Sequence, residues 1–557
     1  MDDEPFVSTP NVILVLTDDQ GYGDLGCHGN DKIKTPNLDN LYKESIRFTQ
    51  FYTSPLCSPT RAGLLTGRYE YRSGIRATVE GRSLLRPDEY TIAEIFSAAG
   101  YRTGIFGKWH LGDNYPLRAM DRGFQETLVH GGGGIGQTPD FWGNTYFNPV
   151  LCHNGIWKKF EGYCTDIFFN AAIDFIEKNK DRPFFVYIPT NAPHTPLQID
   201  ESYVEPYRKM GLSENLAKFY GMITNIDENM GRLLKKLEEL ELDANTIVIF
   251  MSDNGGWSGV EYYNAGMRGH KGTVYEGGIR VPFFIRWPEK LSPKDINEIA
   301  AYIDVLPTLL DACNIPKPVG ASFDGKSLLP LMLDKEVEWP ERTLFFQRGN
   351  IPDEQLYGNC AVRTPKYKLV NLKELYDMVA DPGEKENIAD EFPDVVKQLR
   401  KMYDEWYRDV SKGFRDPVRI YVGSIRENPI LINCMDWHGE VARTGLWRQD
   451  VIINKAKTEP EGNGYWEIDI QRSGDYRITL YKCHPKASPE LKTLKKGSAR
   501  LKIGDIDVTQ PINEGDTSVS FHVRLKEGPA RLQTFLSGQR KDGKEVGAYF
   551  IEIEYLD

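Results

Sequence analysis

Apolar residues recur along the first 300 residues in two alternating spacings. Short unbroken runs, rich in β-branched and aromatic residues, predict strands that are covered on both faces. The segments between them repeat apolar residues every three or four positions, as amphipathic helices do. This alternation predicts an α/β domain with a mainly parallel central sheet flanked by helices. The predicted strands are 12–16, 102–106, 184–188, 246–251 and 281–285, and the clearest helices are 165–178 and 216–240.

The pattern changes after residue 341. Two β-like runs, 343–348 and 360–369, precede a helix that ends near Asp409, which predicts a small α+β subdomain. The stretch 411–417 (SKGFRDP) is rich in turn residues and marks a boundary. Beyond it, alternating segments separated by glycine-containing turns predict a β-sandwich-like domain. These segments are 465–470, 476–481, 519–525 and 549–555, and the division is 1–341, 342–412 and 413–557.

Composition excludes several classes of protein. The chain has 557 residues, of which 40% are hydrophobic and 12% aromatic, as expected for more than one globular domain. Its 68 Lys+Arg and 80 Asp+Glu give a net charge of −12, which argues against a nucleic-acid partner. No stretch approaches the roughly 18 unbroken apolar residues of a membrane span. The eight cysteines form no CxxC pair, and Cys152 and Cys164 are one candidate disulfide.

Polar side chains follow the predicted strands directly, at the edge where open parallel sheets bind ligands. Three carboxylates and one amide oxygen among them would form an oxygen-only site that suits Ca²⁺ or Mg²⁺, and not zinc. Without a cation, carboxylates crowded together would repel one another or take up protons. The residues are Asp18 and Asp19, Lys108 and His110, Asn191 and His194, and Asp253 and Asn254, each pair after a different strand.

Each of these residues also has a plain structural explanation. Asp18 and Asp19 are compatible with a helix cap, and residues 253–256 (DNGG) with a turn. A lone histidine is compatible with a hydrogen-bonded structural role. Their convergence on one edge of the predicted sheet favours a functional site.

Residues 56–61 (LCSPTR) form a second cluster. A Cys-x-Pro-x-Arg string is expected by chance about 0.03 times in a chain of this composition, so it is informative. Cys57 alone is compatible with a buried structural thiol. As a nucleophile, it would have Arg61 one helical turn later and facing the same way.

These residues and several further strings resemble the type I sulfatases of the alkaline-phosphatase-like superfamily. The strings follow the family's order and spacing and cover about residues 10–408, so the last domain lies outside the resemblance. They are DDQGYGDLG (18–26), CSPTR (57–61), GKWHLG (107–112), APHTP (192–196), SDNG (252–255) and KGTVYEGG (271–278), with LYD (375–377), Asp381-Pro382 and Asn387 in the subdomain.

The resemblance implies a mechanism. A formylglycine-generating maturation enzyme would oxidise Cys57, and the hydrate of the resulting formylglycine would be the nucleophile beside one Ca²⁺ per chain. His194, with Lys271, would donate a proton to the leaving alcohol. His110 would take a proton from the remaining hydroxyl, which expels sulfate and restores the aldehyde. The implied metal ligands are Asp18, Asp19, Cys57, Asp253 and Asn254, and the implied fixed positive charges are Arg61, Lys108 and Lys271.

The leaving group is expected to be a sugar. The glycine-rich stretch 130–140 (HGGGGIGQTPD) is long for a structureless connection, which favours a functional loop. Aromatic and charged residues around it and near Lys271 suit a sulfated ring, such as that of a glycosaminoglycan or a sulfated galactan. The candidate substrate-binding residues are His130, Trp142, Trp257, Arg268 and His270.

Two other functions stay open at this level. Phosphonate and phosphodiester hydrolases of the superfamily share the Cys-x-Pro-x-Arg string, and a catalytically silent relative would only bind glycans. In the last domain, Trp437, Trp447, Tyr465 and Trp466 are compatible with sugar stacking, but we expect core positions and a domain that braces its neighbour. The sequence makes no prediction of oligomeric state.

The first residues, MDDEP, contain neither the basic region nor the apolar core of a signal peptide. Members of the family that the chain resembles act outside the cytoplasm, often in the periplasm, or in lysosomes. We therefore expect an exported protein, periplasmic or secreted, whose leader is missing from this chain.

Overall fold

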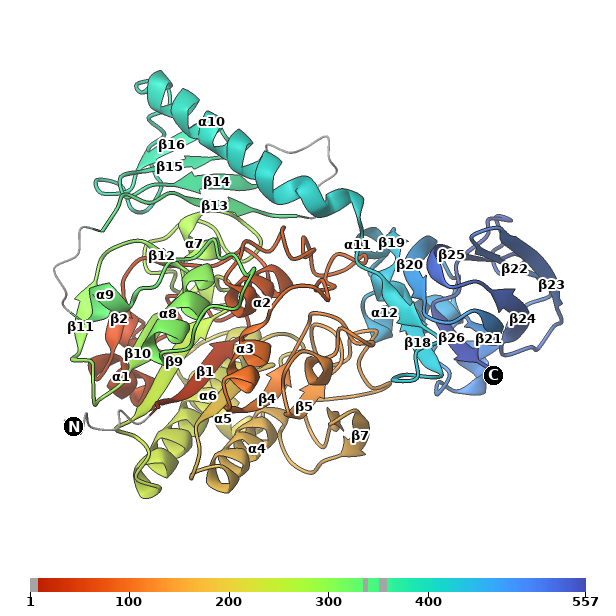
Figure 1. The fold of residues 1–557 in the computed structure, drawn as a ribbon, viewed down its shortest axis with the longest axis horizontal. Helices are drawn as coiled ribbons and strands as arrows, with labels where there is room; N and C mark the ends of the chain where they lie inside the picture. The colour runs from red at the N-terminus through yellow and green to blue at the C-terminus, as the bar shows by residue number, and fades with distance from the viewer. Residues whose placement is uncertain (1–8, 334–338, 350–357, 557) are drawn as a thin grey trace.

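The computed structural model describes residues 9–333, 339–349 and 358–556, so the prediction about the leader lies outside it. A ten-stranded sheet forms its largest part, in the order β11-β2-β10-β9-β1-β8-β4-β5-β6-β7 (Figure 1). Five neighbouring strands at its centre are parallel, which confirms the predicted fold class. They are β9 (Thr246–Ser252), β1 (Asn11–Thr17), β8 (Phe184–Pro189), β4 (Arg102–Lys108) and β5 (Glu126–His130).

The edges of this sheet depart from the parallel pattern. The predicted strand 281–285 is β10 (Phe283–Arg286), and it runs antiparallel to β9. Beyond it, β2 (Ile46–Phe48) pairs antiparallel with β10 and parallel with β11 (Lys294–Ile296). At the other edge, β6 (Val150–His153) and β7 (Ile156–Lys159) form an antiparallel hairpin.

Alternate side chains of β1 enter two separate cores, because successive residues of a strand face opposite sides. Val12, Leu14 and Leu16 pack in one buried cluster, and Ile13 and Val15 pack in another. All seven residues of β1 are buried, as the apolar run predicts. The first cluster includes side chains of α2 (Cys57–Thr66), α3 (Ile92–Ala98) and α8 (Val305–Ala312), and the second those of α1 (Pro36–Lys43), α4 (Cys164–Lys178) and α6 (Glu214–Glu239).

The subdomain is a four-stranded antiparallel sheet covered by one helix. The predicted single run 360–369 is wrong: it is two strands, because Pro365 supplies no N–H for a ladder and the chain turns between Thr364 and Tyr367. On the helix, Trp406 stacks on Phe345 with ring centroids 5.1 Å apart. The elements are β13 (Leu344–Gln347), β14 (Cys360–Arg363), β15 (Tyr367–Val370), β16 (Glu374–Asp377) and α10 (Pro393–Val410).

The last domain packs two sheets face to face, as the alternating pattern predicts (Figure 1). Trp437 and Trp466 are completely buried between them, so these two are core residues and the sugar-stacking interpretation is wrong for them. One sheet contains β17 (Ile420–Val422), β19 (His438–Gly439), β20 (Gly464–Ile470), β22 (Gly497–Ile503), β23 (Ile506–Ile512) and β25 (Gly528–Leu536); the other contains β18 (Ile430–Asn433), β21 (Gly474–Tyr481), β24 (Val519–Leu525) and β26 (Phe550–Tyr555).

The subdomain and the last domain differ in how their cores connect to the core of the α/β domain. The buried cluster of the large sheet continues into β13–β16, whereas the sandwich has a cluster of its own. Among the buried residues of the sandwich cluster, only Val79, Leu84 and Leu117 come from the α/β domain. The boundaries at 341/342 and 412/413 stay predictions.

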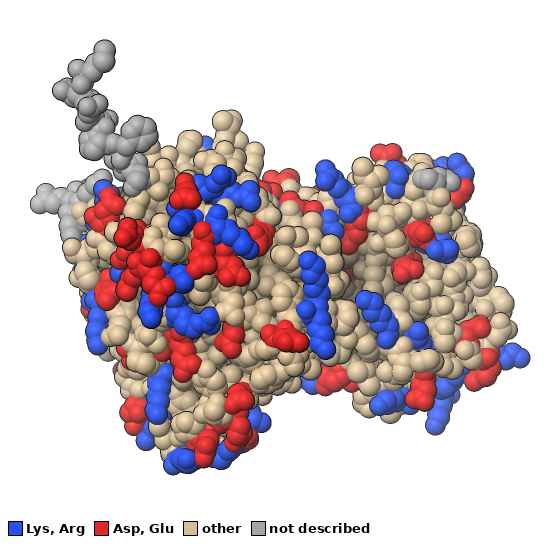
Figure 2. Space-filling view, turned by 90° about the horizontal axis from the view of Figure 1, so that it is seen from below, with Lys and Arg blue, Asp and Glu red and all other residues tan. Residues whose placement is uncertain are grey.

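All eight cysteines lie in the described part of the chain and are free, so the candidate Cys152–Cys164 disulfide is wrong. Cys164 is buried in the core between the sheet and α4, whereas Cys152 on β6 lines a cavity beside the last domain. None of the helices in the described ranges is long and apolar enough to cross a membrane. On the face in Figure 2, acidic and basic side chains are interspersed.

Candidate active site

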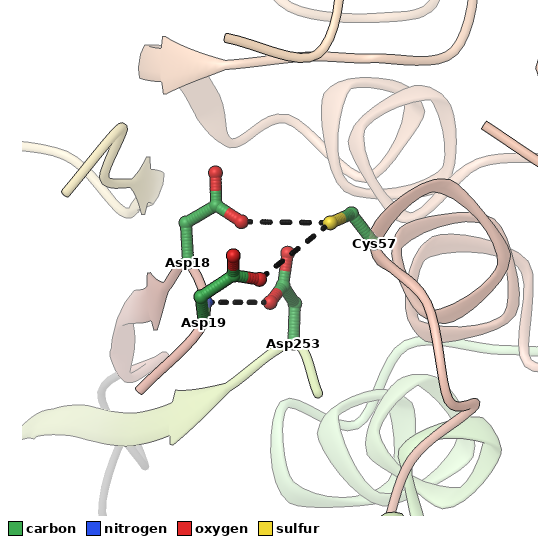
Figure 3. A group of neighbouring side chains, drawn as sticks. All are labelled: Asp18, Asp19, Cys57 and Asp253. Carbon is green, nitrogen blue, oxygen red and sulfur yellow. Dashed lines mark hydrogen bonds between the residues drawn. The ribbon is translucent and has the colours of Figure 1, made fainter. Parts of the chain in front are cut away.

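A compact group of three acidic side chains faces the sulfur of Cys57 from one side, at the carboxyl edge of the central strands (Figure 3). Asp18 and Asp19 follow β1, and Asp253 follows β9, its parallel neighbour. Cys57 is the first residue of α2. One ligand atom from each of these four buried residues lies within 4.8 Å of all the others. The predicted convergence therefore holds in the fold.

The backbone at Asp19 brings the two strand ends together. Asp19 has a φ of 71°, in the left-handed region that is sparsely populated by residues other than glycine. Its N–H donates to Asp253 Oδ1 at 3.2 Å. Such a strained conformation persists only where the surrounding structure holds it in place, and conformations of this kind cluster at functional sites.

Each of the three carboxylates has a different cation within 2.8 Å, and Arg61 Nη2 is also 4.0 Å from Asp18 Oδ1. The Arg61 and Lys108 pairs are completely buried and Lys271 is 15% exposed, so the attraction within the pairs is strong and little screened by salt. All three cations are among the residues that the sequence analysis selected. The pairs are Arg61 Nη2 with Asp253 Oδ2 at 2.7 Å, Lys108 Nζ with Asp18 Oδ2 at 2.8 Å, and Lys271 Nζ with Asp19 Oδ1 at 2.6 Å.

The site perturbs the protonation of its own groups. Burial, reinforced by the charge of Asp18, raises the pKa of Asp253 to about 6. Burial alone would also raise the pKa of Asp19, but Lys271 and His194 hold it well below its usual range. Burial and the charge of Asp253 raise the pKa of the Cys57 thiol to about 12. An unmodified thiol here therefore stays protonated at neutral pH and is a poor nucleophile.

The donor set fits a hard divalent cation. Asn254 donates from Nδ2 to Asp19 Oδ1 at 2.9 Å, and its Oδ1 is buried with no hydrogen-bond partner among the described residues. A buried amide oxygen without a partner is costly, and a cation would satisfy it. Three carboxylates and one amide oxygen are the ligand chemistry that Ca²⁺ prefers.

Two histidines stand beside this group. His110, with a φ of 61°, places Nε2 3.2 Å from the carbonyl oxygen of Thr78, and its buried Nδ1 has no partner among the described residues. His194 Nε2 is 3.9 Å from Asp19 Oδ2. Burial lowers the pKa of His194 to about 4 and, with Lys108 and Arg61, holds that of His110 well below its usual range. Both rings are neutral at neutral pH.

The glycine-rich stretch is a wall of the site rather than an open loop. A Cβ atom on Gly133 would lie 2.2 Å from His110 Cε1, and one on Gly134 would lie 3.2 Å from His194 Nδ1. The backbone approaches the two rings as closely as only glycine permits. At its start, His130 is buried, with Nδ1 2.9 Å from the carbonyl oxygen of Gly131.

The other candidate substrate-binding residues lie in different places. Trp257 is 51% exposed and meets the ring of His270 edge-on at 5.5 Å, next to Lys271. Arg268 is held by the subdomain, with Nη1 2.7 Å from the hydroxyl of Tyr376. Trp142 stacks on His484 of the last domain with ring centroids 5.2 Å apart.

One group at the site has no signal in the sequence. The carbonyl of Thr78 holds His110, but any residue can supply a carbonyl, so no sequence signal marks it. Asn191 follows β8 at the same edge as the carboxylates, as expected. Its Oδ1 accepts from Thr165 Oγ1 of α4 at 3.3 Å, and its Nδ2 is buried with no hydrogen-bond partner among the described residues.

A parallel sheet with this arrangement of carboxylates, cations and a cysteine at its carboxyl edge defines an alkaline-phosphatase-like hydrolase. Residues 10–315 match the Sulfatase family, and residues 269–409 match the family "N-sulphoglucosamine sulphohydrolase, C-terminal". The chain belongs to the sulfatase family and is a sulfuric ester hydrolase.

Relatives and solved structures agree with this assignment. Arylsulfatase A of Homo sapiens is 31% identical over 470 residues, covering 71% of this chain and 87% of the relative. N-acetylgalactosamine-6-O-sulfatase of Bacteroides thetaiotaomicron is 28% identical over 489 residues, covering 71% and 92%. The crystal structure of Ps i-CgsB in complex with k-i-k-neocarrahexaose has a TM-score of 0.66 at 28% identity, covering 72% of this chain and 93% of that one.

Proposed function

We propose that this enzyme removes sulfate from a sulfated saccharide, with formylglycine at position 57 as the nucleophile and one bound Ca²⁺. The observation that carries the proposal is the position of Cys57. It lies among three carboxylates and three cations, in surroundings that raise the pKa of a thiol to about 12. Conversion to a hydrated aldehyde replaces an inert thiol with a hydroxyl that a cation can activate.

The chain's own residues would hold the metal and the ester. Asp18, Asp19, Asp253, Asn254 and the hydrated side chain at position 57 would be the ligands of Ca²⁺. When bound, the ion would lower the pKa of the attacking hydroxyl and attract the sulfate oxygens. The fixed charges of Arg61, Lys108 and Lys271 would stabilise the negative charge that develops in the transition state.

Proton transfers fall to the two histidines and one lysine. His194 Nε2 and Lys271 Nζ both lie beside Asp19, at 3.9 Å and 2.6 Å from its carboxylate oxygens. Burial opposes the charge on Lys271, but Asp19 raises its pKa above the usual range, so it keeps its proton. Lys271 would supply the proton, and His194 would pass it to the leaving alcohol. His110, neutral and with an unpartnered Nδ1, would accept the proton whose loss expels sulfate.

The relatives support a sulfated saccharide as substrate, since one is an N-acetylgalactosamine-6-O-sulfatase and one solved structure contains k-i-k-neocarrahexaose. The exposed ring of Trp257 beside His270 would stack on the sugar, which makes this pair our first choice for substrate contacts. His130, Arg268 and Trp142 remain candidates of lower rank, because each is held by other contacts. We propose a glycosaminoglycan or sulfated-galactan oligosaccharide, encountered in the periplasm or outside the cell.

The nucleophile can be tested directly. Mass analysis of the peptide that contains Cys57 is expected to show an aldehyde or its hydrate, and Cys57→Ala is expected to abolish sulfate release. Ala62→Gly, in the same helix, serves as the matched control for folding. Full activity in protein whose Cys57 is entirely an unmodified thiol would contradict the proposal.

Removal of the metal is expected to abolish activity and to destabilise the fold. A ligand at one hundred times its dissociation constant stabilises the native state by about 2.7 kcal/mol. Chelation with EGTA should therefore lower the unfolding midpoint, and added Ca²⁺ should restore both midpoint and activity. Elemental analysis that finds stoichiometric zinc and no calcium would overturn this part.

The ester class is tested by rates on matched substrates. We expect a sulfate monoester to be cleaved faster than the corresponding phosphate monoester, phosphodiester or phosphonate. Sulfated mono- and disaccharides, scored by which sulfate is lost, then identify the ring position. Faster cleavage of the phosphonate or diester would move the enzyme to another branch of the superfamily, and binding of every sugar without release would indicate a silent relative.

A further inference from the structure

The last domain holds the glycine-rich wall of the site through one buried side chain. Gln449, the first residue of α12 (Gln449–Lys457), is 4% exposed. Its Nε2 lies 2.8, 3.0 and 3.3 Å from the carbonyl oxygens of Gln137, Asp140 and Phe141, and its Oε1 accepts from Gly143 N at 2.9 Å. One amide thus holds both ends of the segment 137–143.

The contact continues from this segment to the histidines. Gln137 Oε1 accepts from Gly133 N at 2.8 Å. Gly133 in turn lies against the ring of His110, where no Cβ atom would fit, and Gly134 lies against His194. Neighbouring backbone bonds strengthen the hold, since Gln449 N donates to Gly136 O at 3.1 Å and Thr138 N donates to Trp447 O at 3.0 Å.

A second contact from the same domain reaches His110 through another segment of the chain. The segment 76–82 carries Thr78, whose carbonyl oxygen is 3.2 Å from His110 Nε2. Two residues further on, Glu80 N donates to Met435 O at 2.8 Å, and the Glu80 carboxylate accepts from Ala442 N at 3.0 Å. Glu80 has a φ of 67°, in the left-handed region, so its backbone conformation is strained at the point where it contacts the last domain.

From these two contacts we infer that the C-terminal domain helps to position the active site, and that Gln449 is a positioning residue for His110 and His194. The inference rests on the proposed function, because it assigns those histidines to the reaction. It gives the last domain a role that does not require sugar binding. A 1 Å displacement of a catalytic group costs about 100-fold in rate, so such positioning matters.

Two variants test the inference in the full-length, calcium-loaded enzyme. Gln449→Ala removes all four side-chain contacts, and Gln449→Glu keeps the shape but loses the N–H donors. We expect kcat on a sugar sulfate to fall by about 10- to 100-fold in both, with KM little changed. The loss should be smaller on 4-nitrophenyl sulfate, whose phenolate leaves without a proton, if His194 is displaced.

The matched control is Gln539→Ala. Gln539 is 1% exposed in the same domain, and its Nε2 donates to the carbonyl oxygens of Lys495 and Ser537 at 2.9 and 3.0 Å. It touches neither contact segment, so its loss should leave kcat unchanged in folded protein. An equal loss of kcat in Gln539→Ala would mean that the domain acts only through global stability, and would overturn the inference.

A readout that needs no activity separates this inference from the proposed function. In Gln449→Ala, amide hydrogen exchange is expected to accelerate in peptides covering 131–143, relative to the wild type and to Gln539→Ala. Unchanged exchange there, or an unchanged kcat in an active and folded variant, overturns the positioning role. A third outcome is possible: the wild type releases no sulfate, but Gln449→Ala still accelerates amide exchange in 131–143. That result would refute the proposed function and leave the contact between Gln449 and the glycine-rich stretch supported.

Discussion

Charge balance at the level of single residues explains how an acidic protein can hold an anionic ester. Arg61 donates from Nε and Nη2 to Asp253 Oδ2, at 3.1 and 2.7 Å, and from Nη1 to the carbonyl oxygen of Lys108 at 3.0 Å. Its planar fork therefore joins the ends of β9 and β4, which a lysine would not do. The net charge of the chain, −12, says little about the potential at this point.

The residue-scale prediction concerns the wall. Gly133→Ala places a methyl group 2.2 Å from His110 Cε1, so either the wall or the ring must move. We expect kcat to fall by about 100-fold or more, measured by sulfate release under saturating substrate. Gly134→Ala is the graded control, because its methyl would lie 3.2 Å from His194 Nδ1. Equal rates in Gly133→Ala and wild type would show that the wall yields freely.

At this scale the sequence predicted which residues form the site better than it predicted what each side chain contacts. Asp18, Asp19, Asp253 and Cys57 meet as expected, because strand ends of a parallel sheet share an edge and the residue types fit one chemistry. Trp142 was chosen for its closeness in sequence to the glycine-rich stretch. A side chain a few residues away in an irregular segment can face either domain, and this one stacks on His484.

At the scale of elements, the sulfatase string 271–278 is tied to the subdomain by a buried group of charges. Lys368 on β15 places Nζ 2.9 Å from Glu276 Oε1, on α7 (Glu276–Ile279), and 2.7 Å from Glu384 Oε1. All three side chains are essentially inaccessible to solvent. The group joins two elements and fixes the chain that carries Lys271.

Breaking this group should be costly. Lys368→Met removes the cation that the two buried carboxylates share and leaves Glu276 only the more distant Arg280, 3.9 Å away, so we expect the free energy of unfolding to fall by about 3–5 kcal/mol. Urea denaturation measures the change. Adding Glu276→Gln to Lys368→Met should recover part of the loss, because one of the unpaired charges is then gone. A single variant as stable as the wild type would show that the carboxylates simply take up protons.

Element types were predictable where the apolar period was clear, and element pairings were not. The runs at β1, β8 and β9 and the period of α4 and α6 lie within one or two residues of the observed bounds. The direction of β10 depends on how its connection crosses the sheet, and apolar spacing carries no information about that. The hairpin β14–β15 was read as one strand because its turn is only three residues long.

At the scale of the whole molecule, the interface between the domains contains two acidic groups, Asp113 and Asp436, that form no ion pair with any described residue. Burial, with the charge of Asp113 added, raises the pKa of Asp436 to about 8. Burial raises that of Asp113 to about 6. A raised carboxyl pKa means that the folded state holds the proton more tightly than the unfolded chain. The contribution of these two groups to the free energy of unfolding therefore falls as pH rises from about 4 to 8.

Asp436→Asn should remove the part of this dependence that Asp436 contributes. The variant is expected to be more stable than the wild type at pH 8, and its advantage should shrink as pH falls, by at most about 1.4 kcal/mol per pH unit. Urea unfolding at pH 5, 6.5 and 8 measures the trend. Asp505→Asn, at an exposed position of the same domain, is the control. Parallel curves for Asp436→Asn and wild type would contradict the prediction.

The burial of Cys57 orders the events in the life of this chain. Its side chain is 2% exposed and its backbone is part of α2. In the folded protein the sulfur is therefore inaccessible to another enzyme, and no extended segment around it is available for binding. If Cys57 is converted to formylglycine as proposed, the oxidation would therefore come before folding, while residue 57 is still in an unfolded chain. The segments that close the site from the far end, near Met435 and Gln449, are synthesised almost 400 residues later. Under the proposed function, the time needed to synthesise these later segments would be available for the oxidation, and folding before oxidation would leave an inactive thiol.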